Sequence, residues 1–401
     1  MALVSHNKGV SYCGRAFLFL CLALAGCSTA SRERPPDFTL VSEPEQVVVT
    51  EPAPIVAAKP VPAPTPPPAP VLAPPPAPTP TNRFTETWVP LERWSQVNSF
   101  AAPRRVSADA SQVYAITASN GTMTVKIGSQ TAHWNGLEYL LGFAPQIING
   151  RPCIHNLDVR KNFEPLVTYP SGVVKSNRVI VIDPGHGGMD TGAKSAYNNQ
   201  FEKDYTLDLA RRLQALLVTN GWTILLTRTN DLNLALSNRV VFAEQHKADL
   251  FLSLHFNSSS PDHAQAGLET YCLTPAGMPS NLTRGFHDNA GLSFPNNKFD
   301  VENLQYAVLL HRAVLKVNGF QDRGVRRARF LGVLQGQNRP AVLVEGGYLS
   351  NPKEARQIAD PAYRQKLAET LAGALLQDSG TVSLATHPPA ATPPASEVKT
   401  N

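Results

Sequence analysis

The sequence Val179-Ile-Val-Ile-Asp-Pro-Gly-His186 joins a short apolar run to a turn of small residues that ends in histidine. Four β-branched residues in a row, bounded by proline and glycine, are typical of a strand buried on both faces of a sheet. Two later runs have the same form, Leu250-Phe-Leu-Ser-Leu-His255 and Ala341-Val-Leu-Val-Glu345. Ligands bind outside the carboxyl ends of strands in an open α/β sheet, so the polar residues that end these runs are predicted to converge on one site.

Helical stretches alternate with the apolar runs between residues 178 and 378. Residues 202–218 carry leucines at helical spacing, and residues 237–246 form a second helical stretch. A further short apolar run covers residues 223–227. This alternation predicts an α/β domain with a mostly parallel twisted sheet and helices on both faces.

Composition distinguishes globular from non-globular segments in the rest of the chain. The whole chain of 401 residues includes 35 prolines, too many for uniform globular structure. Residues 27–83 are dominated by proline with alanine, valine and threonine, which prefers extended polyproline II and predicts a tether. Residues 379–401 are again rich in proline, alanine and threonine and are predicted to be disordered.

Residues 84–170 contain short runs typical of strands and predict a small β-rich domain ahead of the α/β domain. Its turn signals are the pairs Asn120-Gly121, Asn135-Gly136 and Asn149-Gly150. The segment loosely resembles the small modules found before wall hydrolases, and its role is either to bind cell wall or to act as a spacer.

Residues 1–26 are predicted to be a signal peptide that is removed. Lys8 and Arg15 precede an apolar run over residues 16–25, which is too short to span a bilayer as a helix. The run closes in Leu24-Ala-Gly-Cys27, which resembles the bacterial lipoprotein signal, where cleavage before the cysteine follows its acylation. An ordinary signal peptide that ends near a cysteine is the alternative, because small residues before the cut are common to both classes.

The lipoprotein resemblance predicts an exported protein held to a membrane by a lipid at Cys27. Ser28 follows where an aspartate would resemble an inner-membrane retention signal, so the outer membrane, facing the periplasm, is favoured. The folded part keeps Cys153 and Cys272, which are predicted to be two separate buried thiols rather than a disulfide.

The net charge of +5 and the pI near 8.9 favour contact with an anionic surface such as cell wall. The excess of basic residues is not concentrated enough to indicate nucleic acid as a partner. Charge is therefore supporting evidence only, and it does not define the chemistry of the protein.

Four polar residues are candidates for a site at the sheet edge. His186 lies in a turn of small residues that leaves its imidazole accessible, and His255 ends a second buried run. Neutral imidazole is the commonest protein ligand for zinc, so the pair is a candidate metal site. Glu345 ends a third run, where a carboxylate is costly unless it is paired or used. Glu202 either completes a capping box with Asn199, which the local pattern favours, or serves the site.

Four motifs, in order along the chain, resemble those of the type-3 N-acetylmuramoyl-L-alanine amidases. They are Val181-Ile-Asp-Pro-Gly-His-Gly-Gly188, Leu226-Thr-Arg-Thr-Asn-Asp231, Ala248-Asp-Leu-Phe-Leu-Ser-Leu-His-Phe-Asn257 and Pro340-Ala-Val-Leu-Val-Glu-Gly-Gly-Tyr-Leu-Ser-Asn351. The resemblance implies a zinc ion held by His186, Glu202 and His255, with Glu345 as the catalytic base.

The resemblance also implies the reaction, which is hydrolysis of the amide between the lactyl group of N-acetylmuramic acid and L-alanine in peptidoglycan. Such an enzyme acts in cell-wall remodelling or daughter-cell separation and needs Zn²⁺ but no organic cofactor. Two rival functions are a zinc peptidase of the stem peptide and an inactive wall-binding anchor. The intact set of four site residues argues against the anchor.

Residues 274–303 depart from the minimal family pattern, because they are rich in asparagine, glycine and proline and lack an amphipathic period. Some family members carry a regulatory helix here that blocks the zinc, a control that would involve an activator protein. A loop lining the groove is the other interpretation. A basic cluster follows, which is either a solvated face or a site for stem-peptide carboxylates: Arg323, Arg326, Arg327 and Arg329.

Overall fold

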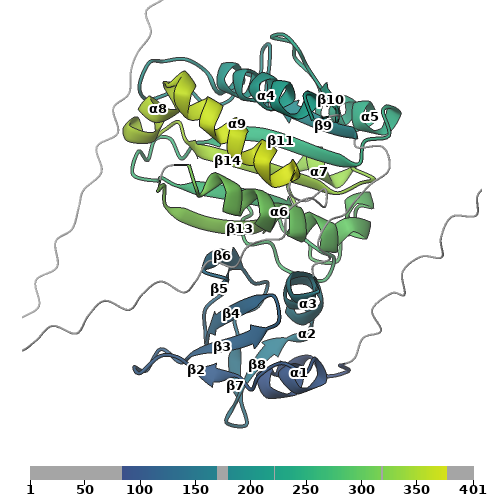
Figure 1. Cartoon of the computed structure of the whole chain (residues 1–401), viewed down its shortest axis with the longest axis vertical. Coiled ribbons are helices and arrows are strands. Elements are labelled where there is room, and N and C mark those ends of the chain that lie inside the picture. The colour runs from purple at the N-terminus through teal and green to yellow at the C-terminus, as the bar shows by residue number, and fades with distance from the viewer. Residues whose placement is uncertain (1–83, 169–178, 221, 318, 377–401) are drawn as a thin grey trace, which may run out of the picture. The chain divides into compact units, whose positions relative to one another are not determined.

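The computed structural model describes residues 84–168, 179–220, 222–317 and 319–376 (Figure 1). Outside these residues lie the predicted signal peptide 1–26, the tether 27–83 with Cys27, and the tail 379–401. Among the helices of the described ranges, none is long and apolar enough to cross a membrane.

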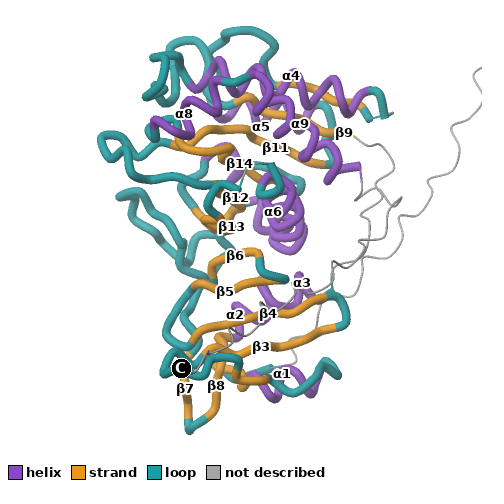
Figure 2. Tube along the Cα trace, turned by 60° about the vertical axis from the view of Figure 1, so that its left-hand side comes forward, coloured by secondary structure: helices purple, strands orange, loops and turns teal. Residues whose placement is uncertain are grey.

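Apolar runs of the carboxyl-terminal half form neighbouring strands of one large sheet. They are β9 (Val179–Pro184), β10 (Thr223–Leu226), β11 (Leu250–Asn257), β12 (Leu268–Leu273), β13 (Asp322–Ala328) and β14 (Ala341–Tyr348). Their order is β10-β9-β11-β14-β12-β13. Figure 2 shows β9, β11, β14, β12 and β13 in this succession. The first four strands in this order, β10, β9, β11 and β14, are parallel to one another, as predicted.

The prediction of a mostly parallel sheet is wrong, because the sheet is mixed. β12 runs antiparallel to β14. A parallel return needs a crossover of about a dozen residues or more, usually with a helix, whereas β12 follows β11 after a loop over residues 258–267 that contains no helix. Beyond β13, β6 (Leu137–Leu140) adds in parallel through Tyr139 and Val325, and antiparallel strands of the β-rich segment continue the sheet.

The β-rich segment contributes short antiparallel strands to two sheets. Its strands are β1 (Trp88–Pro90), β2 (Arg104–Arg105), β3 (Val113–Ala118), β4 (Gly121–Lys126), β5 (Thr131–Trp134), β6, β7 (Gln146–Ile148) and β8 (Arg151–His155). β2 to β6 form a meander at the edge of the large sheet, and β1, β8 and β7 form a separate three-stranded sheet. The segment is completed by α1 (Leu91–Val97), α2 (Asn156–Asp158), the π-helical turn η1 (Val159–Phe163) and α3 (Glu164–Val167).

Two of the three predicted asparagine-glycine turns are confirmed. In Asn135-Gly136 and Asn149-Gly150, φ is 51° at both asparagines and 81° and 73° at the glycines. Two consecutive left-handed residues are what a type I′ hairpin turn requires. At the third pair, Gly121 already pairs with Ala118 in the ladder, so the turn lies one residue earlier than predicted.

Helices cover both faces of the large sheet, as predicted. α4 (Glu202–Val218), α6 (Asp300–Val314) and α9 (Pro361–Leu376) pack together on one face, where Figure 1 shows α4 and α9 side by side. α5 (Leu236–Gln245) and α7 (Gly332–Gln335) pack on the other. The alternation of β9 accounts for this arrangement, because Ile180 and Ile182 join the core under α4, whereas Val181 joins the core under α5. α8 (Pro352–Ala359) follows β14.

Cys153 and Cys272 are both buried and unpaired, which confirms the prediction of two separate thiols. They lie in different sheets, in β8 and β12. Burial raises the pKa of both thiols, so they stay protonated near neutral pH.

Buried polar contacts tie the β-rich segment to the α/β part of the chain. The Arg327 guanidinium donates hydrogen bonds to the Lys161 carbonyl oxygen at 2.6 Å and to Asn162 Oδ1 at 3.1 Å. Lys161 Nζ in turn lies 2.8 Å from Asp300 Oδ2. Arg327 therefore has a structural role and is not available to a substrate.

Candidate metal centre

His186 follows β9 in a turn whose backbone is held by two buried arginines. Arg228 donates hydrogen bonds to the carbonyl oxygens of Pro184 at 3.0 Å and Gly185 at 2.9 Å. Arg239 donates to the carbonyl oxygens of Pro184 at 2.9 Å and His186 at 2.8 Å. The φ angle of His186 is 63°, which is uncommon outside glycine, so these contacts hold the imidazole against the local backbone preference.

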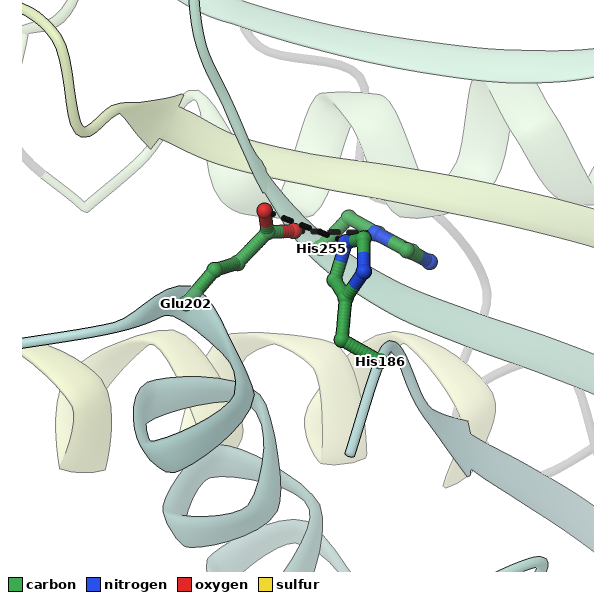
Figure 3. Close-up of side chains that lie close together, drawn as sticks. All are labelled: His186, Glu202 and His255. Atoms are coloured by element: carbon green, nitrogen blue, oxygen red, sulfur yellow. Dashed lines mark hydrogen bonds and ion pairs between the residues drawn. The ribbon is translucent and has the colours of Figure 1, made fainter. Parts of the chain in front are cut away.

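The side chains of His186, Glu202 and His255 come together from the turn after β9, the first turn of α4 and β11 (Figure 3). One ligand atom from each lies within 4.8 Å of the other two. Glu202 Oε2 is 3.1 Å from His186 Nε2, and Glu202 Oε1 is 2.9 Å from His255 Nδ1. The fold thus gathers the three residues that the sequence singled out as metal ligands.

Glu202 does not cap α4, which is the role that the local pattern favours. The helix follows Phe201, whose side chain makes no capping hydrogen bond. The Glu202 carboxylate instead accepts hydrogen bonds from the backbone N–H of Ala193 at 2.9 Å and of Phe256 at 3.0 Å. It is turned away from the helix end and toward β11, as a role in the site requires.

The charges of the cluster shift the pKa values of its members. Burial alone would raise the pKa of Glu202, but hydrogen bonds from His186 and His255 outweigh it and hold that pKa below its ordinary value. Burial lowers the pKa of His186, but Glu202 and Asp190 outweigh it and raise the pKa to about 9. The buried carboxylate therefore attracts positive charge, which a divalent cation supplies.

Two imidazole nitrogens and one carboxylate oxygen are a donor set that fits zinc and leaves a fourth position for water or substrate. His186 has a further feature of a zinc ligand, because its Nδ1 lies 2.8 Å from Asp190 Oδ1. A carboxylate on the second ring nitrogen fixes the tautomer and the ring orientation. Asp190 was not predicted from the sequence, although its place in the same glycine-rich turn was an available signal.

Glu345 completes the site from the neighbouring strand. It lies opposite His255 in the register of β14 with β11, and opposite residues of adjacent strands share a face of the sheet. Its side chain is buried, and its Oε2 has no hydrogen-bond partner among the described residues. Burial and the charge of Glu202 raise the pKa of Glu345 well above its ordinary value. An unpartnered buried carboxylate oxygen is costly in a purely structural role, which favours a role in chemistry.

Residues 274–294 form a loop without a helix, followed by the 3₁₀ turn η2 (Pro295–Phe299) and α6. The structure thus agrees with the loop interpretation of this segment. Leu282 and Arg284 of the loop line a hollow beside β12 and β14. Arg329 is buried beneath the loop and donates to two of its carbonyl oxygens at 3.1 and 2.7 Å, so Arg329 is structural, as Arg327 is.

Replacing Gly185 with alanine should abolish metal binding. A Cβ at this position would lie 2.3 Å from His255 Cε1 and 2.4 Å from its Nε2, so the ring must move out of the cluster. Gly373→Ala in α9 is the matched control, because a Cβ there meets nothing within 4 Å and alanine favours a helix. Metal analysis of both purified variants checks the prediction, and full zinc content in Gly185→Ala would contradict it.

The fold and the donor set together define an α/β protein with a candidate histidine-glutamate-histidine metal site. A family model described as N-acetylmuramoyl-L-alanine amidase matches residues 180–377, a range that contains the three candidate ligands and Glu345. The chain belongs to this family of amidases.

Individual relatives carry the same description. The N-acetylmuramoyl-L-alanine amidase AmiA of Salmonella typhimurium is 31% identical over 222 residues, which cover 50% of this chain and 76% of that protein. AmiA of Escherichia coli is 32% identical over 216 residues, covering 49% and 74%. Among solved structures, the catalytic domain of the amidase CwlV from Bacillus (Paenibacillus) polymyxa var. colistinus is 31% identical with a TM-score of 0.41, and the match covers 50% of this chain and 97% of that one.

Proposed function

We propose that this chain hydrolyses the amide between the lactyl group of N-acetylmuramic acid and L-alanine in peptidoglycan, in cell-wall remodelling or daughter-cell separation. Membership of the amidase family supports the choice of bond and substrate. The observation that carries the mechanism is the unpartnered oxygen of buried Glu345, on the strand next to His255.

Each residue of the site has a separate task in this mechanism. His186, Glu202 and His255 would hold a zinc ion, which when bound supplies a Lewis acid that polarises a carbonyl oxygen and lowers the pKa of water toward ~7. Asp190 accepts a hydrogen bond from Nδ1 of His186, which leaves Nε2 free as a ligand. Glu345 accepts a proton from the attacking water at its carboxylate and returns it to the leaving nitrogen of L-alanine.

Mass spectrometry of digested peptidoglycan tests the proposed bond against the rival peptidase. An amidase releases intact stem peptides and leaves muramoyl sugars without peptide, so we expect both products after incubation with the full chain. Shortened peptides that remain attached to sugar would instead identify a peptidase of the stem peptide. Heat-inactivated protein provides the background digest.

We also propose that the protein is an exported lipoprotein, anchored at Cys27 in the outer membrane and facing the periplasm. The support is in the sequence, in the motif that ends at Cys27 and in Ser28 after it. A polyproline segment extends about 3.1 Å per residue, so the tether over residues 27–83 would let the enzyme reach on the order of 100 Å from the membrane.

Changing Cys27 to alanine should release the protein from membranes without loss of fold, because the anchor and the α/β domain are separated by the tether. Fractionation of cells, followed by a high-salt wash of the membranes, measures this. Ser28→Ala serves as the control and should stay in the membrane fraction. Retention of the Cys27 variant in washed membranes would show that the lipoprotein assignment is wrong.

A further inference from the structure

Three arginines line a hollow of about 310 Å³ that the proposed mechanism does not use, and Glu269, which also lines it, pairs with Glu345 in the sheet. Arg323 and Arg326 reach it from β13, and Arg284 reaches it from the loop before α6. The carboxylates of Glu269 and Asp262 also line it, so the guanidinium groups outnumber the carboxylates. The hollow therefore has the charge that suits an anionic ligand.

A row of side chains connects this hollow to the candidate metal centre. His255 lies opposite Glu345, and Glu345 lies opposite Glu269 on β12. Arg323 Nε of the next strand donates to Glu269 Oε1 at 2.8 Å. Neighbouring strands are about 4.8 Å apart, so the arginines are roughly two strand spacings from Glu345. An extended peptide advances about 3.5 Å per residue, which brings the first residues after the scissile amide within reach of the guanidinium groups.

The guanidinium groups of Arg323 and Arg326 are held through Nε, which leaves their terminal nitrogens available, whereas Arg284 donates from a terminal nitrogen to Asn257 Oδ1 at 3.0 Å. Glu269 Oε1 accepts a hydrogen bond from Arg323 Nε and lies 3.3 Å from Arg326 Nε, which also donates to the Arg323 carbonyl oxygen at 2.9 Å. Their side chains are 21% and 19% exposed, and no hydrogen bond between described residues uses their terminal nitrogens. Two anchored guanidinium groups with free N–H pairs are suited to bidentate binding of a carboxylate.

We propose that Arg284, Arg323 and Arg326 form a subsite for a free carboxylate of the stem peptide, on the leaving side of the scissile amide. This inference rests on the proposed function and specifies the direction in which the substrate lies across the sheet. The muramoyl sugar offers no carboxylate, because its lactyl carboxyl group is part of the amide. The peptide therefore extends over β12 and β13, and the glycan lies on the side of His186.

Two synthetic muramoyl dipeptides test this subsite, identical except that the second residue carries either a free α-carboxylate or a carboxamide. We expect wild-type kcat/KM to favour the carboxylate by about tenfold, the size of one hydrogen bond to a charged group. In Arg326→Met and Arg284→Met that ratio should fall toward one, with the amidated substrate still cleaved. Arg284 is exposed, so its variant tests the proposal even if Arg326→Met folds poorly. Arg104→Met, at an exposed position of β2, should keep the wild-type ratio.

Calorimetric binding of the two released dipeptides separates this inference from the proposed reaction. If the wild-type protein binds the dipeptide with the free carboxylate more tightly and both arginine variants lose this preference, the subsite is supported. This holds even if no muramoyl peptide is cleaved, because failure of cleavage would count against the proposed reaction and not against the subsite. Equal kcat/KM for both substrates in the wild-type protein, or an unchanged preference in both variants, would overturn the subsite.

Discussion

With Glu345 replaced by glutamine, amide hydrolysis should fall by about 10² to 10⁴ while zinc stays bound, which is the range that general acid–base groups contribute. The amide is nearly isosteric with the carboxylate, so the packing between β11 and β12 should be kept. It cannot accept the proton of the attacking water or return one to the leaving nitrogen. Turnover of a muramoyl peptide and zinc content, measured on the same preparation, check both parts of this prediction.

Glu354 provides the matched control for Glu345, because it is also a buried glutamate. Its carboxylate accepts hydrogen bonds from the backbone N–H of Gly267 at 2.8 Å and Tyr348 at 2.7 Å, which is a structural role. Glu354→Gln should lower the melting temperature and keep turnover near normal below it. If the Glu345 variant behaved in the same way, the mechanism would have no base.

Alanine at His186 or at His255 should remove zinc together with activity. Each histidine supplies one of three candidate protein ligands, and the remaining pair would hold the metal poorly. Metal analysis after dialysis against a weak chelator is the readout. His246→Ala, at an exposed position after α5, should keep a full equivalent of zinc.

The alanine variants at His186 and His255 also test where the metal binds. Variants that lose activity but keep one equivalent of tightly bound zinc would place the metal at other residues. We expect these variants to lose zinc but to keep their fold, which circular dichroism monitors.

Much of the α/β part could be predicted because its signals are local. The bounds of α4 agree with the sequence prediction. The leucines whose spacing indicated this helix, Leu209, Leu213 and Leu217, fall on one face and are buried. The apolar runs that lead to His255 and Glu345 have a pattern that only a buried strand or helix can use, and they form most of β11 and β14, which continue past these residues to Asn257 and Tyr348. The candidate site followed from the place of polar residues at the ends of these runs.

The role of Glu202 could not be decided from its neighbourhood. Its partner His255 is 53 positions away, and only the folded chain brings the two within 2.9 Å. Resemblance to a family favoured the metal role, whereas the local pattern favoured a cap. The physical reason for the outcome is that two histidines and two backbone N–H groups outweigh a single helix end.

The mixed character of the sheet was hidden by charges on its inner strands. β12 contains Glu269 and β13 contains Arg323 and Arg326, so neither strand has the apolar pattern of a buried strand. These charges pair across the two strands, and such long-range pairing leaves no signal at either position alone. The reversal between β11 and β12 went unpredicted for the same reason.

Anomalous X-ray scattering at the zinc edge, from crystals of the zinc-loaded protein, tests the central claim most directly. We expect one strong peak at about 2.0–2.2 Å from a nitrogen of His186, a nitrogen of His255 and the carboxylate of Glu202. Glu345 should lie close enough to hydrogen-bond a water in the fourth position. A peak bound by other residues, or zinc held without Glu202, would contradict the metal centre and the mechanism built on it.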